Sequence, residues 1–251
     1  MMDRRNRSGM SKIPLERHFP ESGWVLEKQV LDADSVRQCR TFFEERLADL
    51  DRQFGHGQLD DSAPAYRHYL RGEFDLETRL DFRVVQLLST ARVTKFVSQF
   101  LGVDRYLIHY PPMIRFKRPG AAASAVPLHQ DSAYNAHLQD FITVWVPLVD
   151  IDEECGGVIV YPGTHHQAEM PHSAAGGWEA GLSEEPGLGD AHHVLMDAGD
   201  VLLFPKNLLH KSAPHRSPDR IRFSVDFRVF FDPSQTSKSF FDVQTGQVTR
   251  A

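Results

Sequence analysis

The stretch Arg220-Ile-Arg-Phe-Ser-Val-Asp-Phe-Arg228 decides the fold class, because polar and apolar side chains alternate along it. A period of two places Ile221 and Phe223 on one face of an extended strand and the arginines on the other face. The sequence therefore predicts a β-strand here, with a row of guanidinium groups on one of its faces.

Further short runs of β-branched and aromatic residues lie before this stretch, and clusters of Pro, Gly, Asn and Asp separate them. With the first stretch included, the predicted strands lie at residues 106–117, 141–148, 157–161, 193–196, 201–204 and 221–231. Two helical patterns come earlier, from Asp34 to Gly55 and from Leu76 to Leu101, where apolar residues recur at steps of three and four.

This order of helices and strands predicts an α+β fold, because no helices separate the strands. Eight or so strands in two sheets fit a double-stranded β-helix, the cupin-like jelly roll, with the N-terminal helices packed outside it. We expect a single domain over residues 1–251: mainly helical support in 1–105, the jelly-roll core in 106–231 and a tail in 232–251.

The composition excludes several classes of protein. With 28 Lys and Arg against 34 Asp and Glu, the formal charge is −6, and no basic stripe is available to bind nucleic acid or a membrane surface. No apolar run is long enough for a membrane span or a signal peptide, so we expect a cytoplasmic protein. Two cysteines, Cys39 and Cys155, cannot form a disulfide framework or a zinc ribbon.

The tripeptide His129-Gln130-Asp131 is the first candidate for chemistry. In an extended segment its imidazole and carboxylate leave the same face and can reach one metal ion. His210 closes another strand-like run, and two histidines with one carboxylate form the facial triad that holds Fe(II) with open positions. The alternative is a hydrogen-bonded surface pair of His129 and Asp131 together with an unrelated core histidine.

The arginines after His210 also allow two interpretations. Arginines in a row on an exposed strand are commonly a solvated face. If the same face lines the barrel interior beside a metal, a buried arginine there needs an anion, and a carboxylate is its natural bidentate partner.

At this point the sequence resembles the phytanoyl-CoA dioxygenase family of Fe(II)- and 2-oxoglutarate-dependent oxygenases. The resemblance covers most of the chain. The closest matches to the family pattern are Thr143-Val-Trp-Val-Pro-Leu148, Pro162-Gly-Thr-His165 and Gly199-Asp-Val-Leu-Leu-Phe204, which leads up to His210.

The resemblance implies His129, Asp131 and His210 as the iron ligands, with 2-oxoglutarate and O2 as cosubstrates. It also implies cosubstrate contacts, which we assign to Ser212, Trp145, Arg115 and an arginine that binds the distal carboxylate. That arginine usually lies about eleven residues after the histidine, whereas Arg220 lies at ten and Arg222 at twelve. Pro218 resembles a one-residue insertion, which favours Arg222 over Arg220.

The activity that the resemblance implies is hydroxylation of an unactivated C–H bond in a small molecule, with release of succinate and CO2. Asp131 favours hydroxylation, because halogenating relatives have a small residue in its place. Desaturation, epimerisation and ring formation use the same cofactors and remain alternatives, as does a metal-binding jelly roll that binds a ligand without catalysis.

The substrate itself cannot be identified from the residues. Gln130 and Tyr134 flank the ligands and are candidate substrate contacts, as is Trp178 in the long loop 167–192. Because this loop is rich in Gly and Ala and is expected at the barrel mouth, we predict that it covers the metal once substrate binds. Trp178, Tyr134 and the apolar residues of the loop suggest that the substrate is a partly apolar small molecule of the secondary-metabolite type.

Overall fold

The computed structural model describes residues 15–55, 64–121, 124–173, 181–183 and 187–250. Its strands form two sheets, and the pairings within both are antiparallel. The larger sheet has eight strands, in the order β1 (Val25–Glu27), β7 (Val201–Pro205), β4 (Ile142–Pro147), β9 (Arg222–Phe230), β2 (Leu107–His109), β10 (Phe240–Asp242) and β11 (Gln247–Thr249), while β3 (Met113–Lys117) also pairs with β9. The smaller sheet has the order β6 (His192–Val194), β5 (Val158–Val160) and β8 (His210–Ser212).

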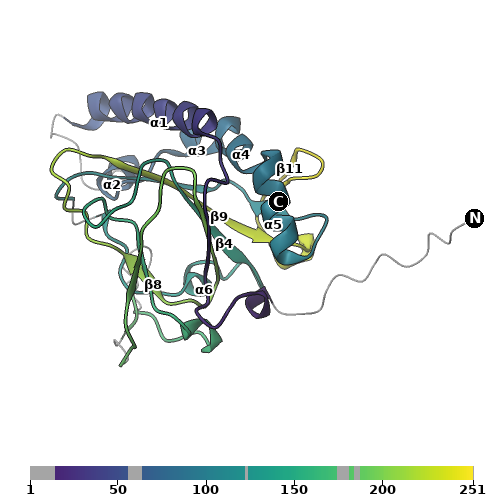
Figure 1. The fold of residues 1–251 in the computed structure, drawn as a ribbon. Helices are drawn as coiled ribbons and strands as arrows, with labels where there is room; N and C mark the ends of the chain where they lie inside the picture. Colours follow the sequence, from purple (N-terminus) through teal and green to yellow (C-terminus); the bar gives the residue numbers. More distant parts are fainter. Residues whose placement is uncertain (1–14, 56–63, 122–123, 174–180, 184–186, 251) are drawn as a thin grey trace, which may run out of the picture.

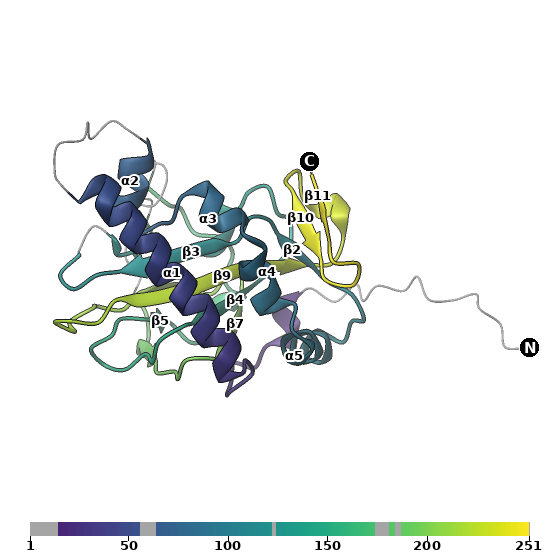
Figure 2. The ribbon, with the colours of Figure 1, turned by 90° about the horizontal axis from the view of Figure 1, so that it is seen from above.

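The helices that precede β2 cover the outer face of the larger sheet (Figure 1). They are α1 (Ala33–Phe54), α2 (Pro64–Leu70), α3 (Leu76–Leu80), α4 (Phe82–Leu88) and α5 (Ala91–Leu101). Seen from above, α1 crosses over β3, β9 and β4 (Figure 2). Asp32 caps the N-terminus of α1, where its side chain accepts a hydrogen bond from the Ser35 backbone N at 2.8 Å. This arrangement confirms the predicted α+β jelly roll with helices outside it.

The alternating pattern of β9 explains how the sheet has two different faces. Phe223, Val225, Phe227 and Val229 belong to the core between this sheet and the helices. Phe43 of α1 is completely buried in that core, and its ring lies 6.4 Å from the ring of Phe223. The even-numbered residues of β9 face the other way, toward the smaller sheet. The strand therefore joins the main core on one side to the space between the sheets on the other.

Several predicted elements differ from the observed ones. The helical pattern from Leu76 to Leu101 is divided into α3, α4 and α5, because Asp81 and Thr90 each begin a new helix as its N-cap. The predicted strand at 106–117 is divided into β2 and β3, since Pro111 and Pro112 lie between them and proline has no N–H to donate.

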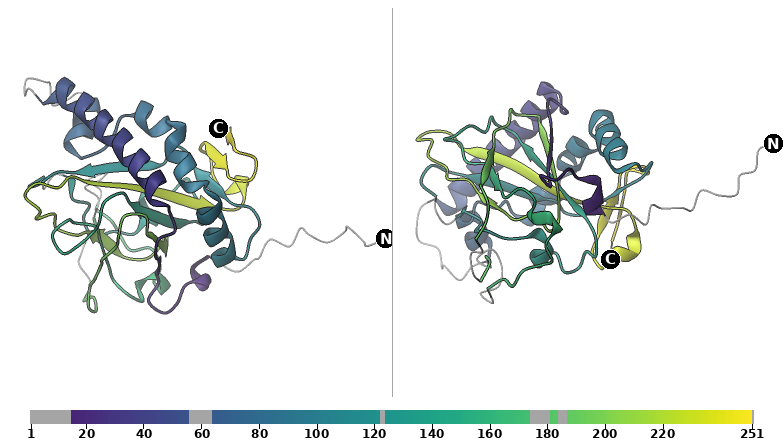
Figure 3. Two further views of the ribbon diagram at one scale, coloured as in Figure 1. Left: turned by 45° about the horizontal axis from the view of Figure 1, so that its top comes forward. Right: turned by 60° about the horizontal axis from the view of Figure 1, so that its bottom comes forward.

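The C-terminal segment, predicted to be a tail, contains a hairpin of the larger sheet. Strand β10 pairs with β2 on one side and with β11 on the other, and both views of Figure 3 place this hairpin at one edge of the molecule. The ring of Phe241 in β10 also packs edge-on against Phe82 of α4, with the centroids 6.3 Å apart. In the described part of the chain, no helix is both long enough and apolar enough to cross a membrane.

Candidate active site

The two histidines of the predicted triad lie directly opposite each other on paired backbones. His129 donates a backbone hydrogen bond to the carbonyl of His210 at 3.0 Å, and His210 donates to the carbonyl of His129 at 3.1 Å. The Nδ1 atoms lie 2.8 Å and 2.9 Å from the carbonyls of Pro127 and Leu208. A carbonyl can only accept, so each Nδ1 carries the proton and each Nε2 keeps its lone pair for a metal.

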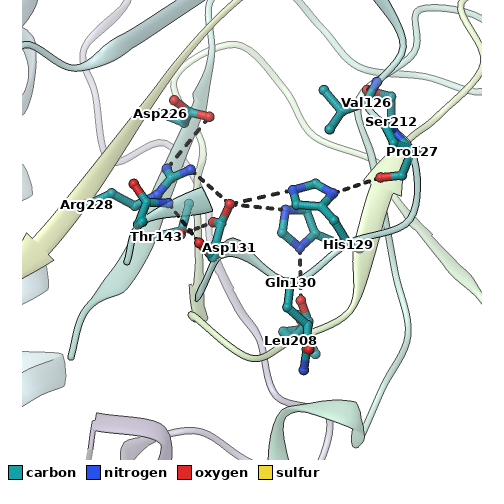
Figure 4. Close-up of polar contacts among 12 residues, drawn as sticks. Val126, Pro127, His129, Gln130, Asp131, Thr143, Leu208, Ser212, Asp226 and Arg228 are labelled. Carbon is teal, nitrogen blue, oxygen red and sulfur yellow. Dashed lines mark hydrogen bonds and ion pairs between the residues drawn. The ribbon is translucent and has the colours of Figure 1, made fainter. Parts of the chain in front are cut away.

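Asp131 completes the cluster from the first residue of the short helix α6 (Asp131–Tyr134). The backbone of Gln130 is extended, with φ −112° and ψ 138°, as expected for a residue between two ligands that leave the same face. The predicted extended segment ends there, because helix α6 begins at Asp131. The Asp131 Oδ1 atom lies 3.6 Å from the Nε2 atom of His129 and 3.9 Å from that of His210 (Figure 4). All three side chains are buried, and their ligand atoms lie within 4.8 Å of one another.

The charges around the cluster keep its ligands ready for a metal. Burial alone would raise the pKa of Asp131, but the Arg228 guanidinium and the two imidazoles hold it far below its ordinary value. Burial, together with His129, lowers the pKa of His210 to about 3. At neutral pH the site therefore offers an ionised carboxylate and a neutral imidazole at His210.

Two hydrogen bonds fix the orientation of the Asp131 carboxylate. Arg228 Nη2 donates to Oδ1 at 2.9 Å, and the Thr143 hydroxyl donates to Oδ2 at 2.5 Å. Such outer contacts orient a metal ligand and tune its affinity. Two imidazoles and one fixed carboxylate are the donor set of non-haem Fe(II) sites with open positions, so the residues present fit this metal.

The cluster opens into a cavity of about 330 Å3 between the two sheets. Among the predicted site residues, those in the cavity wall are His129, Asp131, His210, Arg222, Ser212, Trp145, Arg115 and Tyr134. Trp178 lies outside the described residues. The structure thus brings the metal ligands and the predicted cosubstrate contacts, except Arg220, to one space.

Of Arg220 and Arg222, it is Arg222 that reaches this cavity. It begins β9, is only 4% exposed, and its guanidinium lies 5.8 Å from the centroid of the Trp145 ring. Burial and the nearby Arg115 lower the pKa of Arg222 to about 10, so the group stays charged at neutral pH. Its Nε has no hydrogen-bond partner among the residues that the structure describes. A buried cation of this kind fits the distal carboxylate of 2-oxoglutarate.

Lys117 lies beside Arg222, and Ser212 lines the same cavity. Lys117 pairs with it in register on β3, is 3% exposed, and donates from Nζ to the Ala213 carbonyl at 3.2 Å. Burial, followed by the charges of Arg222 and Arg115, lowers the pKa of Lys117 to about 8. Ser212 on β8 accepts a hydrogen bond at its Oγ from the Val126 backbone N at 3.0 Å.

Arg220 lies elsewhere. Its Nη1 and Nη2 atoms bind the carboxylate of Asp152 at 2.8 Å and 2.9 Å, and both side chains are partly exposed. The residue precedes β9 and is not part of the cavity wall. Of the two arginines that the sequence leaves open, the structure therefore brings only Arg222 to the metal cluster.

The remaining predicted contacts have different surroundings. Gln130 is completely buried, and its amide donates to the Asn207 carbonyl at 2.8 Å and accepts from the Met170 backbone N at 2.7 Å. Its side chain joins two loops and is not part of the cavity wall. The Tyr134 ring packs edge-on against His129 with the centroids 4.9 Å apart. Burial and the charge of Asp131 raise the pKa of Tyr134 to about 12, so its phenol stays protonated.

Sequence reasoning missed Thr143, Lys117, Asp226 and the contact that Arg228 makes with Asp131. For Arg228 and Asp226 the signal was present, because both belong to the polar face of the alternating strand. For Thr143 it lay in the same motif as Trp145, two residues away, where alternation places both side chains on one face.

Comparisons with known proteins agree with this geometry. The family model described as phytanoyl-CoA dioxygenase matches residues 19–224. The 1-deoxypentalenic acid 11-beta-hydroxylase of Streptomyces exfoliatus is 28% identical over 246 residues, which cover 90% of this chain and 83% of that protein.

Solved structures share the fold. A non-haem monooxygenase, ThoJ in its apo form, gives a TM-score of 0.67 at 19% identity, and the match covers 91% of this chain and 83% of that one. The epimerase SnoN, solved with Fe3+, alpha-ketoglutarate and nogalamycin RO, gives 0.59 at 21% identity, with 86% and 82% covered. The family match extends over most of the chain and includes both histidines, Asp131 and Arg222, so this protein belongs to the phytanoyl-CoA dioxygenase family, whose enzymes use Fe(II) and 2-oxoglutarate.

Proposed function

We propose that this protein is a 2-oxoglutarate-dependent dioxygenase that hydroxylates a C–H bond of a partly apolar small molecule. The observation that carries the proposal is the placement of His129, Asp131 and His210 in one cavity with the buried Arg222. A metal site alone would also suit a binding module. A buried, charged arginine in the same wall gives the cavity a place for a dicarboxylate cosubstrate.

Each residue has a role in this proposal. His129 and His210 bind Fe(II) through Nε2 and Asp131 through Oδ1. Arg222 and Ser212 hold the distal carboxylate of 2-oxoglutarate, and Trp145 packs beside it. Fe(II) held there would supply the chemistry of oxidative C–H cleavage with 2-oxoglutarate and O2 as cosubstrates; one oxygen atom of O2 would enter succinate, formed with CO2, and the other would enter the new hydroxyl group.

The chain's own contribution is positioning and exclusion of water. Phe204 and Val158 line the cavity along with Trp145, and such walls keep bulk solvent from the reacting atoms. Thr143 and Arg228 hold the Asp131 carboxylate in place before the metal arrives. A carboxylate at position 131 would bind the metal where a halide would otherwise bind, which supports hydroxylation as the outcome.

The test measures succinate released from 2-oxoglutarate by the purified protein with Fe(II), in the presence of candidate terpenoid and polyketide substrates. The expected result is Fe(II)-dependent succinate, with a product heavier by one oxygen atom. Asp131→Ala should abolish succinate release, while Arg220→Ala, which alters a surface ion pair, should retain it. A product of unchanged mass would indicate epimerisation in place of hydroxylation. A product that lacks two hydrogens would indicate desaturation or ring closure. No Fe(II)-dependent succinate from any substrate would contradict the proposal.

A further inference from the structure

Strand β9 places two more charged side chains in the cavity, beyond the arginine assigned to the cosubstrate. Asp226 and Arg228 follow Arg222 on the same face of the strand, and both line the cavity. Figure 4 shows the Arg228 guanidinium between the carboxylates of Asp226 and Asp131. A group bound beside Arg228 therefore lies next to the metal ligands.

Both side chains keep hydrogen-bonding capacity for a ligand. Arg228 is 9% exposed, and its Nη2 donates a hydrogen bond to Asp131 Oδ1 at 2.9 Å. Its Nη1 lies 3.7 Å from Asp226 Oδ2, an ion pair that is too long for a hydrogen bond. Within the described chain, Arg228 Nη1, Arg228 Nε and Asp226 Oδ1 have no hydrogen-bond partner. Buried groups in this condition favour any ligand that satisfies them.

Asp226 has apolar side chains beside it on both neighbouring strands, and Arg115 is a further charged neighbour in the cavity wall. Asp226 is in register with Met113 on β3 and with Trp145 on β4, and all three line the cavity. Directly opposed residues of antiparallel strands point to the same side of the sheet, so the carboxylate lies between a thioether and an indole. A carbon skeleton can pack on these two side chains while one polar substituent reaches Asp226.

The chemistry of that substituent follows from the charges. A substrate carboxylate would meet the negative Asp226, and a substrate ammonium would meet the positive Arg228 and Arg115, so either ion is opposed by a charge in this wall. A hydroxyl is neutral, and it donates one hydrogen bond and accepts others. One small neutral group therefore satisfies an acceptor and a donor that lie side by side.

We propose that Asp226 and Arg228 form a subsite for a hydroxyl group of the substrate, which orients the carbon skeleton toward the metal. The hydroxyl donates to Asp226 Oδ1 and accepts from Arg228 Nη1. This inference rests on the proposed function, and it adds that the substrate already carries a hydroxyl. A reaction that installs a hydroxyl on the same skeleton, or retains one from a precursor, must therefore come before this step.

The test uses three water-soluble probes that share one ring: cyclohexanol, cyclohexanecarboxylate and cyclohexylamine. Their affinities are measured by ligand-observed NMR on protein loaded with Zn(II), which is redox-inert, and 2-oxoglutarate. We expect cyclohexanol to bind the wild-type protein most tightly. Asp226→Ala should weaken its binding about tenfold or more, because a hydrogen bond to a charged acceptor is lost. Asp226→Asn should strengthen binding of cyclohexanecarboxylate, since the repelling charge is removed.

Matched measurements separate the possible failures. Asp152→Asn removes a carboxylate charge outside the cavity wall and should leave all three probe affinities unchanged. The subsite is wrong if cyclohexanol does not bind, or if it binds no more tightly than the two charged probes. It is also wrong if neither Asp226 variant changes the affinity for cyclohexanol. If the wild-type protein fails to bind Zn(II) and 2-oxoglutarate together, the proposed function fails instead, whatever the probes do.

Discussion

At the scale of single residues, the structure distinguishes the two arginines that the sequence offers as partners for the distal carboxylate of 2-oxoglutarate. Arg222 is buried in the cavity and Arg220 binds Asp152 near the surface. Arg222→Ala should lower the affinity for 2-oxoglutarate at least about a hundredfold, because the distal carboxylate would be left buried without its partner. Arg220→Ala should change it little. Titration calorimetry without oxygen, on protein loaded with Fe(II), measures both, and equal losses would show that Arg222 is not the carboxylate partner.

The hydroxyl of Thr143 gives a second prediction at this scale. Thr143→Val keeps the shape of the side chain but removes the donor to Asp131 Oδ2. Loss of such an outer contact should weaken metal binding by about tenfold to a hundredfold. Thr143→Ser keeps the hydroxyl and should restore most of the affinity. Mn(II) binding followed by electron paramagnetic resonance checks both variants, and a valine variant with wild-type affinity would show that this hydrogen bond does not orient Asp131.

The sequence predicts the ligands better than it predicts what orients them. His129, Asp131 and His210 have a recognisable spacing and motif context, and the structure places them together. The contact from Arg228 to Asp131 joins residues 97 positions apart in the chain, and no local pattern specifies it. Gln130 shows that a position next to the ligands in the sequence does not specify a role in the site. It lies between two ligands in the chain, but its side chain forms hydrogen bonds with two loops.

At the scale of elements, α1 holds the strand that carries Arg222 and Asp226. Phe43 is completely buried between this helix and the sheet, close to the rings of Phe74 and Phe223. Phe43→Ala should lower the free energy of unfolding by about 3 to 5 kcal/mol, because it removes buried apolar surface and leaves a cavity. Glu44→Ala, on the exposed side of the same helix, should change it by less than about 0.5 kcal/mol. Urea unfolding compares the two, and equal effects would contradict the packing described here.

Regular elements with a strong pattern are also the ones that the sequence predicts. The alternation of β9 and the apolar spacing of α1 extend over many residues, so one irregular position does not hide them. Strands β1, β8 and β11 are three residues long and take their structure from a neighbouring strand. Their pairing depends on contacts distant in the chain, which a local pattern cannot contain.

At the scale of the whole molecule, neutral histidines in the cavity wall make the metal-free protein sensitive to acid. Burial, then His137, lowers the pKa of His109 to about 3, and burial, then His129, does the same for His210. The ordinary value is 6.5, so between pH 6.5 and about 3 the unfolded chain binds protons that the folded one does not. Stability should therefore fall as the pH falls through this window.

The size of the effect can be tested at His109, which is not a metal ligand. Each such histidine contributes about 1.4 kcal/mol per pH unit inside the window. His109→Phe should make the decline in unfolding free energy between pH 6 and pH 4 shallower by about this amount per unit. Urea unfolding of the metal-free protein at several pH values measures the slope. An unchanged slope would show that His109 is not held neutral by burial.

The overall architecture follows from the order of patterns along the chain, because helices first and short strands afterwards leave few ways to pack one core. The order of elements in the sequence does not predict how the two sheets pack against each other. Ser212 and His210 come from the smaller sheet, while Arg222 and Trp145 come from the larger one, and only the folded chain brings them to one cavity.

The most direct test of the central claim is a crystal structure of the protein grown without oxygen in the presence of Fe(II) and 2-oxoglutarate, with data collected at the iron absorption edge. We expect one anomalous peak among His129, Asp131 and His210, with the distal carboxylate of 2-oxoglutarate on Arg222. An iron peak elsewhere, or a cosubstrate whose distal carboxylate lies away from Arg222, would contradict the account.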